Sequence, residues 1–140
     1  MSRIFWDSNL FIYLFENNPD FSQTVEDLWK NMLRRRDQLL TSSLTLGEVL
    51  VKPAAMGDYA LCRQYESTLQ SSATILPFEL KAARRYSTIR STTTIKGPDA
   101  IQLACASEAG VDLFVTNDRR LQGKHVEGIQ FIASLDQVPI

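Results

Sequence analysis

The chain has 140 residues, 44% of them hydrophobic and 22% charged, and its formal net charge is −1. These proportions are typical of a folded globular protein and exclude a disordered chain. The near-neutral charge also excludes a strongly basic overall field, so any binding of nucleic acid would depend on local patches. We expect residues 1–140 to form a single domain.

The sequence contains no signal for membrane insertion or export. Its longest apolar runs are much shorter than the roughly 20 residues that span a bilayer. The N-terminus lacks the basic and apolar regions of a signal peptide. The two cysteines, Cys62 and Cys105, do not have the spacing of metal ligands and are expected to be buried free thiols. We therefore expect a cytoplasmic protein with no membrane contact.

The first predicted elements are a strand at residues 3–6 and a helix at residues 10–15, both largely apolar. The residues between them, Asp7-Ser8-Asn9, are of the types that commonly cap helices. Asp7 therefore stands where a strand ends and a helix begins.

An amphipathic helix is predicted from Asp20, with a capping box formed by Asp20 and Gln23. Its last turn is Arg34-Arg35-Arg36. Positive charges at the C-terminal end of a helix are stabilised by the helix dipole, so helix termination explains this run, with a nucleic-acid contact as the alternative.

A strand at residues 38–42 leads into a helix that begins near Thr45 and is expected to stop before Pro53. Thr45 and Glu48 have the spacing of a capping box, which is a structural explanation of Glu48. The next predicted elements are a helix at residues 58–70, a strand at residues 73–78 and a helix at residues 79–90.

The stretch from Lys96 to Asp118 combines a helix and a strand, each with an acid at one end. Gly97-Pro98-Asp99 is typical of a helix start, because proline is tolerated at the first helical position and an acid suits the positive end of the dipole. The helix that follows is mostly apolar and ends at Gly110. A strand at residues 113–116 leads to Asp118, and a last strand is predicted at residues 129–132.

Five strands that alternate with helices predict an α/β fold with a central, mainly parallel sheet covered on both faces. The carboxyl ends of parallel strands share one edge of such a sheet, and ligands bind there. Four acids are expected at or near this edge: Asp7, Glu48, Asp99 and Asp118. Because crowded carboxylates repel one another and no His or Cys accompanies them, the group favours a hard cation, Mg²⁺ or Mn²⁺.

Four short motifs resemble those of the PIN-domain family and occur in the family's order. They are Asp7-Ser8-Asn9, Leu46-Gly47-Glu48-Val49, Pro98-Asp99-Ala100-Ile101 and Thr116-Asn117-Asp118. The chain length and layout are most similar to the VapC-type toxins, the ribonucleases of type II toxin–antitoxin systems. The resemblance implies a three-layer α/β/α PIN-like fold and a Mg²⁺-dependent endoribonuclease that hydrolyses phosphodiester bonds in RNA.

The resemblance also implies roles for individual residues. Four acids match the family's metal-binding, catalytic positions: Asp7, Glu48, Asp99 and Asp118. We expect Asp7 and Asp99 to hold the main ion and the other two to complete its shell or bind a second. Three polar residues match those that support the acids: Asn9, Thr116 and Asn117. Leu121 departs from the family, in which an aromatic residue is common, and this affects packing rather than chemistry.

Toxins of this type usually form homodimers and are neutralised by an antitoxin that covers an apolar groove, so a cognate antitoxin and a homodimer are expected here. Four aromatic residues of the first helices are candidates for lining the groove, with core packing as the alternative: Phe11, Tyr13, Phe15 and Trp29. Four basic residues that flank the acids are candidate RNA contacts, with ordinary surface charge as the alternative: Lys96, Arg119, Arg120 and Lys124.

Other interpretations are open at this point. Asp7 and Asp99 could be helix caps and Asp118 a turn residue, although caps need not share one strand edge. His125 is interpreted as a solvated residue. Two functional alternatives are an RNA-processing PIN nuclease without an antitoxin, which the neighbouring gene would distinguish, and a non-catalytic PIN-fold binding module, which would show no Mg²⁺-stimulated cleavage.

Overall fold

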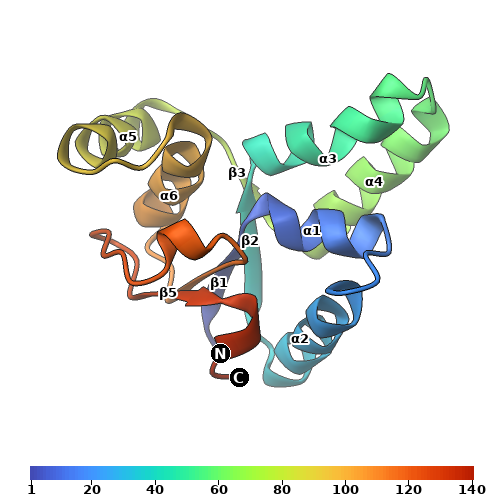
Figure 1. The fold of residues 1–140 in the computed structure, drawn as a ribbon, viewed down its shortest axis with the longest axis horizontal. Coiled ribbons are helices and arrows are strands. Elements are labelled where there is room, and N and C mark those ends of the chain that lie inside the picture. The colour runs from blue at the N-terminus through green and yellow to red at the C-terminus, as the bar shows by residue number, and fades with distance from the viewer.

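The computed structural model describes residues 1–140, in which a five-stranded sheet lies between two layers of helices (Figure 1). All strands are parallel, in the order β3-β2-β1-β4-β5. The strands are β1 (Arg3–Trp6), β2 (Gln38–Ser42), β3 (Thr74–Leu76), β4 (Leu113–Thr116) and β5 (Phe131–Ser134). The helices are α1 (Ser8–Phe15), α2 (Ser22–Arg35), α3 (Ser43–Ala55), α4 (Tyr59–Ser72), α5 (Leu80–Thr92) and α6 (Gly97–Ala109), with short 3₁₀ helices η1 (Arg119–Leu121) and η2 (Leu135–Gln137). The predicted α/β/α class with a central parallel sheet is confirmed.

Alternate residues of the inner strands divide between two hydrophobic cores, one on each face of the sheet. Phe5 of β1 faces the core that α5 and α6 cover, whereas Ile4 and Trp6 face the core beneath α1 to α4. β4 repeats the pattern, and its Phe114 stacks on Phe5 with ring centroids 5.0 Å apart. Because successive side chains of a strand point to opposite faces, a strand covered on both sides must be apolar throughout.

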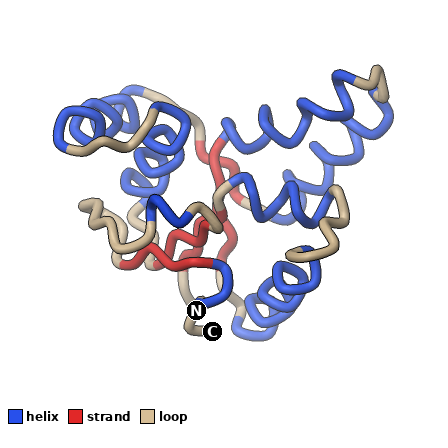
Figure 2. The backbone as a smooth tube through the Cα atoms, in the orientation of Figure 1, coloured by secondary structure: helices blue, strands red, loops and turns tan.

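The strand order reverses between β1 and β4. From β1 the chain moves outward through β2 to β3, and it then returns through α5 and α6 to β4 on the other side of β1 (Figure 2). In open α/β sheets, the crevice at such a switch point is where ligands bind. The register pairs Trp6 with Val115, so Asp7 and Thr116 emerge side by side at the switch point.

Helix α3 differs from its prediction at both ends. It begins at Ser43 and continues through Pro53 to Ala55, although the sequence predicted a start near Thr45 and a stop before the proline. Pro53 lies in the last turn, where it removes a single backbone hydrogen bond, and the packing of α3 against α1 and α4 outweighs that loss. The predicted capping box of Thr45 and Glu48 is wrong, because both residues lie inside the helix.

The start of α2 also differs from its prediction. The capping box of Asp20 and Gln23 does not form, and the helix has no side-chain cap. The Asn18 side chain instead accepts hydrogen bonds from the backbone N–H groups of Asp20 at 2.8 Å and Phe21 at 3.1 Å. An asparagine turn thus precedes the helix and satisfies these N–H groups before the helix begins.

The four aromatic residues of the first helices are buried or partly buried by packing, rather than exposed on the surface. Phe11 is only 3% exposed, so its predicted place in a surface groove is wrong, because α1 lies directly on the sheet. The other three are partly buried and pack on aromatic neighbours: Tyr13 on Phe21, Phe15 on Tyr65 and Trp29 on Trp6. Core packing therefore explains most of their apolar surface.

Smaller features agree with expectation in outline. The third strand is shorter than the predicted residues 73–78, and the last strand begins two residues later than predicted. Both cysteines are free, Cys105 buried and Cys62 half-buried. None of the helices is long and apolar enough to cross a membrane.

Candidate functional site

Asp7 is the most deeply buried of the four acids, with 5% of the residue exposed. It follows β1 and caps α1, because its Oδ1 accepts a hydrogen bond from the Ser8 N–H at 2.8 Å. Its Oδ2 accepts a second bond from the Thr116 hydroxyl at 2.8 Å, across the switch point. The interpretation of Asp7 as a helix cap is therefore correct but accounts for only one of its two carboxylate oxygens.

Thr116 connects the ends of β1 and β4. While its hydroxyl donates to Asp7, its oxygen accepts the Asp118 N–H at 3.0 Å and the Asn9 amide at 3.5 Å. Two of the three predicted supporting residues, Asn9 and Thr116, thus hold Asp7 and the backbone of Asp118 in a fixed relation.

Side chains of α1 reach two further candidate residues. The Ser8 hydroxyl donates to Glu48 Oε1 at 3.0 Å, which ties the acid on α3 to the end of β1. The Tyr13 hydroxyl accepts a bond from the Asn117 amide at 3.1 Å, so Asn117 contacts α1 rather than the acids. The sequence did not indicate a role for Ser8, since 40 residues separate it from Glu48.

A buried polar network lies behind the acids, between β2, α3 and α6. Gln102 Nε2 donates to Thr45 Oγ1 at 2.9 Å, and Gln102 Oε1 accepts from the Ser42 hydroxyl. Thr41 extends the network with bonds to Thr45 at 2.8 Å and to the Trp6 carbonyl at 2.9 Å. The network joins the carboxyl ends of β1 and β2 to both helices.

This network positions two of the acids. Thr45 precedes Glu48 on α3 by three residues, and Gln102 follows Asp99 on α6 by three residues. Residues three apart lie close together on a helix surface. The bond between Thr45 and Gln102 therefore sets the spacing of the helix turns that carry Glu48 and Asp99.

Asp99 and Asp118 share the guanidinium of Arg120. Arg120 Nη2 lies 2.6 Å from Asp118 Oδ2 and 3.7 Å from Asp99 Oδ2, and Arg120 Nε donates to Asp118 Oδ1 at 3.0 Å. Asp99 is in the first turn of α6, as predicted, and Asp118 caps η1. Arg120, a candidate RNA contact, is here the counter-ion of two acids.

The protonation of Asp7 reflects its surroundings. Burial raises the pKa of Asp7 to about 6, and the charges of Asp99 and Glu48 add to the rise. Hydrogen bonds from Thr116 and Ser8 act in the opposite direction but do not cancel the effect. Asp7 thus responds electrostatically to acids on two other helices.

The negative charges of Asp99 and Asp118 are partly balanced by basic side chains. Burial, followed by the charge of Asp118, raises the pKa of Asp99, while Arg120 and Lys96 oppose the rise. Hydrogen bonding from Arg120 lowers the pKa of Asp118. The guanidinium of Arg120 thus acts to lower the pKa of both acids, but at Asp99 it does not cancel the rise that burial and Asp118 produce.

The four acids border one edge of the sheet but do not form a ready-made cage. No group of three or more His, Cys, Asp or Glu side chains lies close enough to hold a metal ion. Asp7 and Glu48 are connected through Ser8, and Asp99 and Asp118 are connected through Arg120. The donors are all oxygen atoms, and Asn9 Oδ1 is buried without a hydrogen-bond partner, so the chemistry of this edge suits a hard cation.

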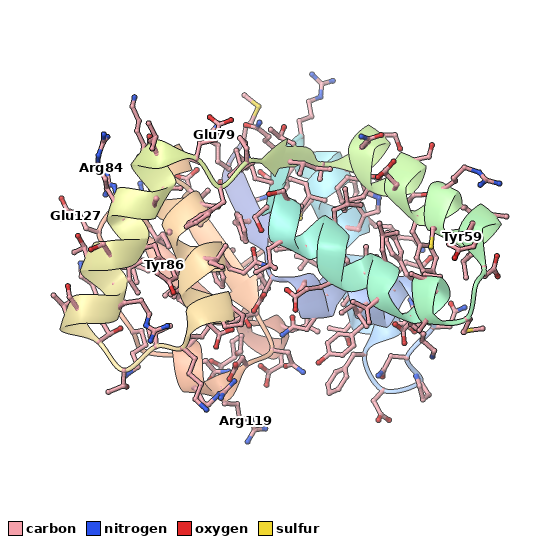
Figure 3. The ribbon with its side chains drawn as sticks, turned by 90° about the horizontal axis from the view of Figure 1, so that it is seen from above. Tyr59, Glu79, Arg84, Tyr86, Arg119 and Glu127 are labelled. Atoms are coloured by element: carbon pink, nitrogen blue, oxygen red, sulfur yellow. The ribbon has the colours of Figure 1, made fainter.

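Basic side chains surround Asp99. Lys96 and Lys124 line a cavity of about 250 Å³ together with Asp99 and Arg120. Arg119 is exposed on η1 at the rim of the molecule (Figure 3). All four candidate RNA contacts thus lie within one surface region next to the acidic edge.

The fold and the acidic edge define an α/β protein with a polar site at the switch point of a parallel sheet. The family model described as PIN domain matches residues 4–125, a range that includes all four acids. The chain belongs to the PIN domain family, as the four motifs predicted. No curated protein sequence matches it.

Solved structures with a similar fold include chains of toxin–antitoxin complexes. A chain of VapBC2 from Rickettsia felis bound to a promoter DNA fragment is 15% identical, with a TM-score of 0.74 over 94% of this chain and 98% of that one. A chain of DNA-bound VapBC from Salmonella typhimurium is 21% identical, with a TM-score of 0.72 over 96% and 99%. A chain of a Klebsiella pneumoniae toxin–antitoxin complex is 23% identical, with a TM-score of 0.66 over 90% and 94%.

Replacing Gln102 with leucine should destabilise the protein by about 1–3 kcal/mol, because the hydroxyls of Thr45 and Ser42 lose a buried partner. Chemical denaturation measures the change. Gln70→Leu, at an exposed position of α4, is the matched control and should change stability by less than about 0.5 kcal/mol. Equal stability of the two variants would contradict the structural role of the network.

Replacing Asp7 with asparagine should stabilise the protein at neutral pH, without divalent cations, by roughly 1–3 kcal/mol. The pKa of the Asp7 carboxyl is about 6 in the folded protein, against an ordinary value of 3.8. The unfolded chain therefore loses this proton more readily than the folded protein, and ionisation of Asp7 lowers the free energy of unfolding. This penalty is complete above the folded pKa and disappears as the pH falls through 3.8. Urea denaturation across this range should show the advantage of the variant shrinking as the pH falls. An advantage that does not depend on pH would contradict the raised pKa.

Proposed function

We propose that the protein is a Mg²⁺-dependent endoribonuclease toxin of the VapC type, acting in the cytoplasm and neutralised by a cognate antitoxin. The observation that supports this most directly is the placement of four carboxylates, from the ends of β1 and β4 and from α3 and α6, around the switch point of the sheet. Membership of the PIN domain family supports it independently. A concentration of negative charge at a ligand-binding crevice suits a cation and, with it, a phosphodiester.

The side chains present fit a hard divalent cation, because every titratable donor at the edge is a carboxylate. Asp7 and Asp99 would hold the main ion, and Glu48 and Asp118 would complete its shell or hold a second. Mg²⁺ is the proposed ion and Mn²⁺ the alternative. When bound, the ion would neutralise charge on the phosphate and lower the pKa of a water molecule.

The protein's own groups would prepare the reaction. Thr116 and the Ser8 N–H hold the Asp7 carboxylate in one orientation. The Ser8 hydroxyl donates to Glu48 and so limits its orientation. One of the four acids would also orient the attacking water. Four basic side chains would contact the phosphates of the RNA: Lys96, Arg119, Arg120 and Lys124.

The proposed partners are an antitoxin and a second copy of the chain. The similar solved structures are chains of VapBC and other toxin–antitoxin complexes, which supports an antitoxin for this protein as well. A small DNA-binding protein encoded beside this chain would agree with the proposal, and its absence would favour an RNA-processing nuclease without an antitoxin.

The purified protein should cleave RNA only in the presence of Mg²⁺ or Mn²⁺, and EDTA should stop the reaction. Asp7→Asn and Asp99→Asn should each reduce the rate by about 100-fold or more, because each removes a charged ligand. Electrophoresis of end-labelled RNA measures the rate. Asp27→Asn, an exposed acid on α2, is the matched control and should retain activity.

Full activity in both acid variants would overturn the assignment of the site. Absence of Mg²⁺-stimulated cleavage by the unmodified protein would instead favour a non-catalytic binding module.

Replacing Arg120 with alanine should tighten the binding of Mn²⁺ several-fold in the absence of RNA. The guanidinium pairs with Asp118 and Asp99, so a cation must displace it to use both acids. Isothermal titration calorimetry measures the affinity. Arg119→Ala removes the neighbouring charge, which makes no ion pair, and serves as the control. The same affinity in both variants would contradict competition between Arg120 and the ion.

A further inference from the structure

We propose that a second hollow, beside the acidic edge, binds the sugar-phosphate backbone of the RNA at nucleotides flanking the cleaved bond. This inference rests on the proposed function and extends it to residues outside the PIN motifs. The hollow has a volume of about 490 Å³ and lies between α5, the end of α6 and residues 125–127. Its polar lining includes Arg84, Arg85, Thr88, Thr92, His125 and Glu127.

The two arginines supply the positive charge of this hollow. Arg84 is exposed and makes no ion pair, so its guanidinium is free to bind an anion. Arg85 is held in place by a hydrogen bond to the Ser107 hydroxyl at 3.2 Å and by Glu108 Oε2 at 3.7 Å from its Nε. A planar guanidinium presents several N–H groups in a fixed arrangement that matches phosphate oxygens.

The threonine hydroxyls add a feature that favours RNA over other phosphate compounds. Thr88, Thr92 and Thr93 use their O–H groups as donors to backbone carbonyls of α5. The oxygens of Thr88 and Thr92 therefore remain as acceptors, whereas that of Thr93 accepts the Ile95 N–H at 3.2 Å. The ribose 2′-hydroxyl is a hydrogen-bond donor that DNA lacks, so acceptors next to a phosphate-binding arginine suit a ribonucleotide.

The hollow and the cavity that contains Asp99 are lined by neighbouring residues of two segments of the chain. Thr92 and Thr93 line the hollow, and the next residue, Thr94, lines the cavity. In the second segment, Lys124 lines the cavity and the next residue, His125, lines the hollow. The two cavities are thus bordered by the same two segments, and the proposal requires an RNA strand to pass from one cavity to the other.

The charge around the hollow and the cavity differs in sign from that of the whole chain. Five Lys and Arg side chains and two carboxylates line them, and two further carboxylates, Glu108 and Asp118, pair with two of the five cations, which leaves a net charge of +1. The whole chain has a net charge of −1. Arg84 and Glu127 lie near each other on the outer side of α5, well apart from Arg119 (Figure 3).

The wall of the hollow is held firmly against α6. The Ser107 hydroxyl donates to the Glu127 carbonyl, and Gly128 approaches so closely that a Cβ there would lie 2.5 Å from the Ser107 carbonyl oxygen. Gly128 also has a φ of +92°, which side chains rarely tolerate. The hollow is therefore part of the packed structure and not a gap beneath a loose loop.

The test measures binding apart from cleavage, with Asp7→Asn as the background. Fluorescence anisotropy would follow a labelled single-stranded RNA of about 12 nucleotides at several salt concentrations. Adding Arg84→Gln should weaken binding roughly three- to tenfold and reduce the slope of log affinity against log salt by about 0.7, the loss of one phosphate contact. Arg63→Gln, an exposed arginine on α4 outside both cavities, is the matched control and should change neither quantity.

Equal affinity and equal salt slope in the Arg84 and Arg63 variants would overturn the inference. Equal binding of RNA and of DNA of the same sequence by the Asp7→Asn protein would also overturn it, because that result indicates general polyanion attraction, whereas tighter binding of RNA than of DNA supports it. These outcomes are separate from the proposed function, because cleavage by the unmodified protein can succeed while Arg84 proves irrelevant. Thermal denaturation should show both arginine variants folded.

Discussion

The burial of Asp7 at the end of β1 is the constraint on which the rest of the site depends. A carboxylate removed from water is tolerated only when its oxygens are hydrogen-bonded, and those of Asp7 have one partner from α1 and one from β4. The same group therefore joins the start of a helix to the end of a neighbouring strand. The cost that remains is visible in the raised pKa of Asp7, about 6, so the position is unfavourable for stability, as is common for residues of functional sites.

Two different kinds of interaction hold the remaining acids. The network around Gln102 is buried and uncharged, and hydrogen bonds of this kind are strong and specific in a low-dielectric interior. The ion pairs of Arg120 lie at the surface, where water and salt weaken them. The helices that carry Glu48 and Asp99 are thus fixed, whereas the positive charge between Asp99 and Asp118 is exchangeable. Such a division is consistent with the proposed function, in which the framework would stay rigid while cations and RNA replaced one another.

The distribution of charge matters more to this protein than its total. A net charge of −1 excludes a general attraction to polyanions, yet the surface around α5 and the segment after β4 is lined by five cations. The acidic edge and the basic surface adjoin because Asp99 lies at one end of the helix that packs on α5. In the proposed function, this separation of negative and positive charge would let one face concentrate a metal ion and the next hold phosphates.

Local patterns in the amino-acid sequence were sufficient to identify the strands and the acids that follow them, because strands buried on both faces are apolar throughout and parallel strands end at one edge. The bonds that hold those acids could not be identified in this way. Ser8 and Glu48 are 40 residues apart, and Thr45 and Gln102 are 57 apart. The predicted capping box of Thr45 failed for the same reason: its hydroxyl bonds to Thr41 and Gln102 instead. Spacing along the chain predicts the hydrogen bonds that residues can form within one helix. A buried hydroxyl, however, bonds to the polar group that tertiary packing brings close to it, and that group can come from a distant part of the sequence.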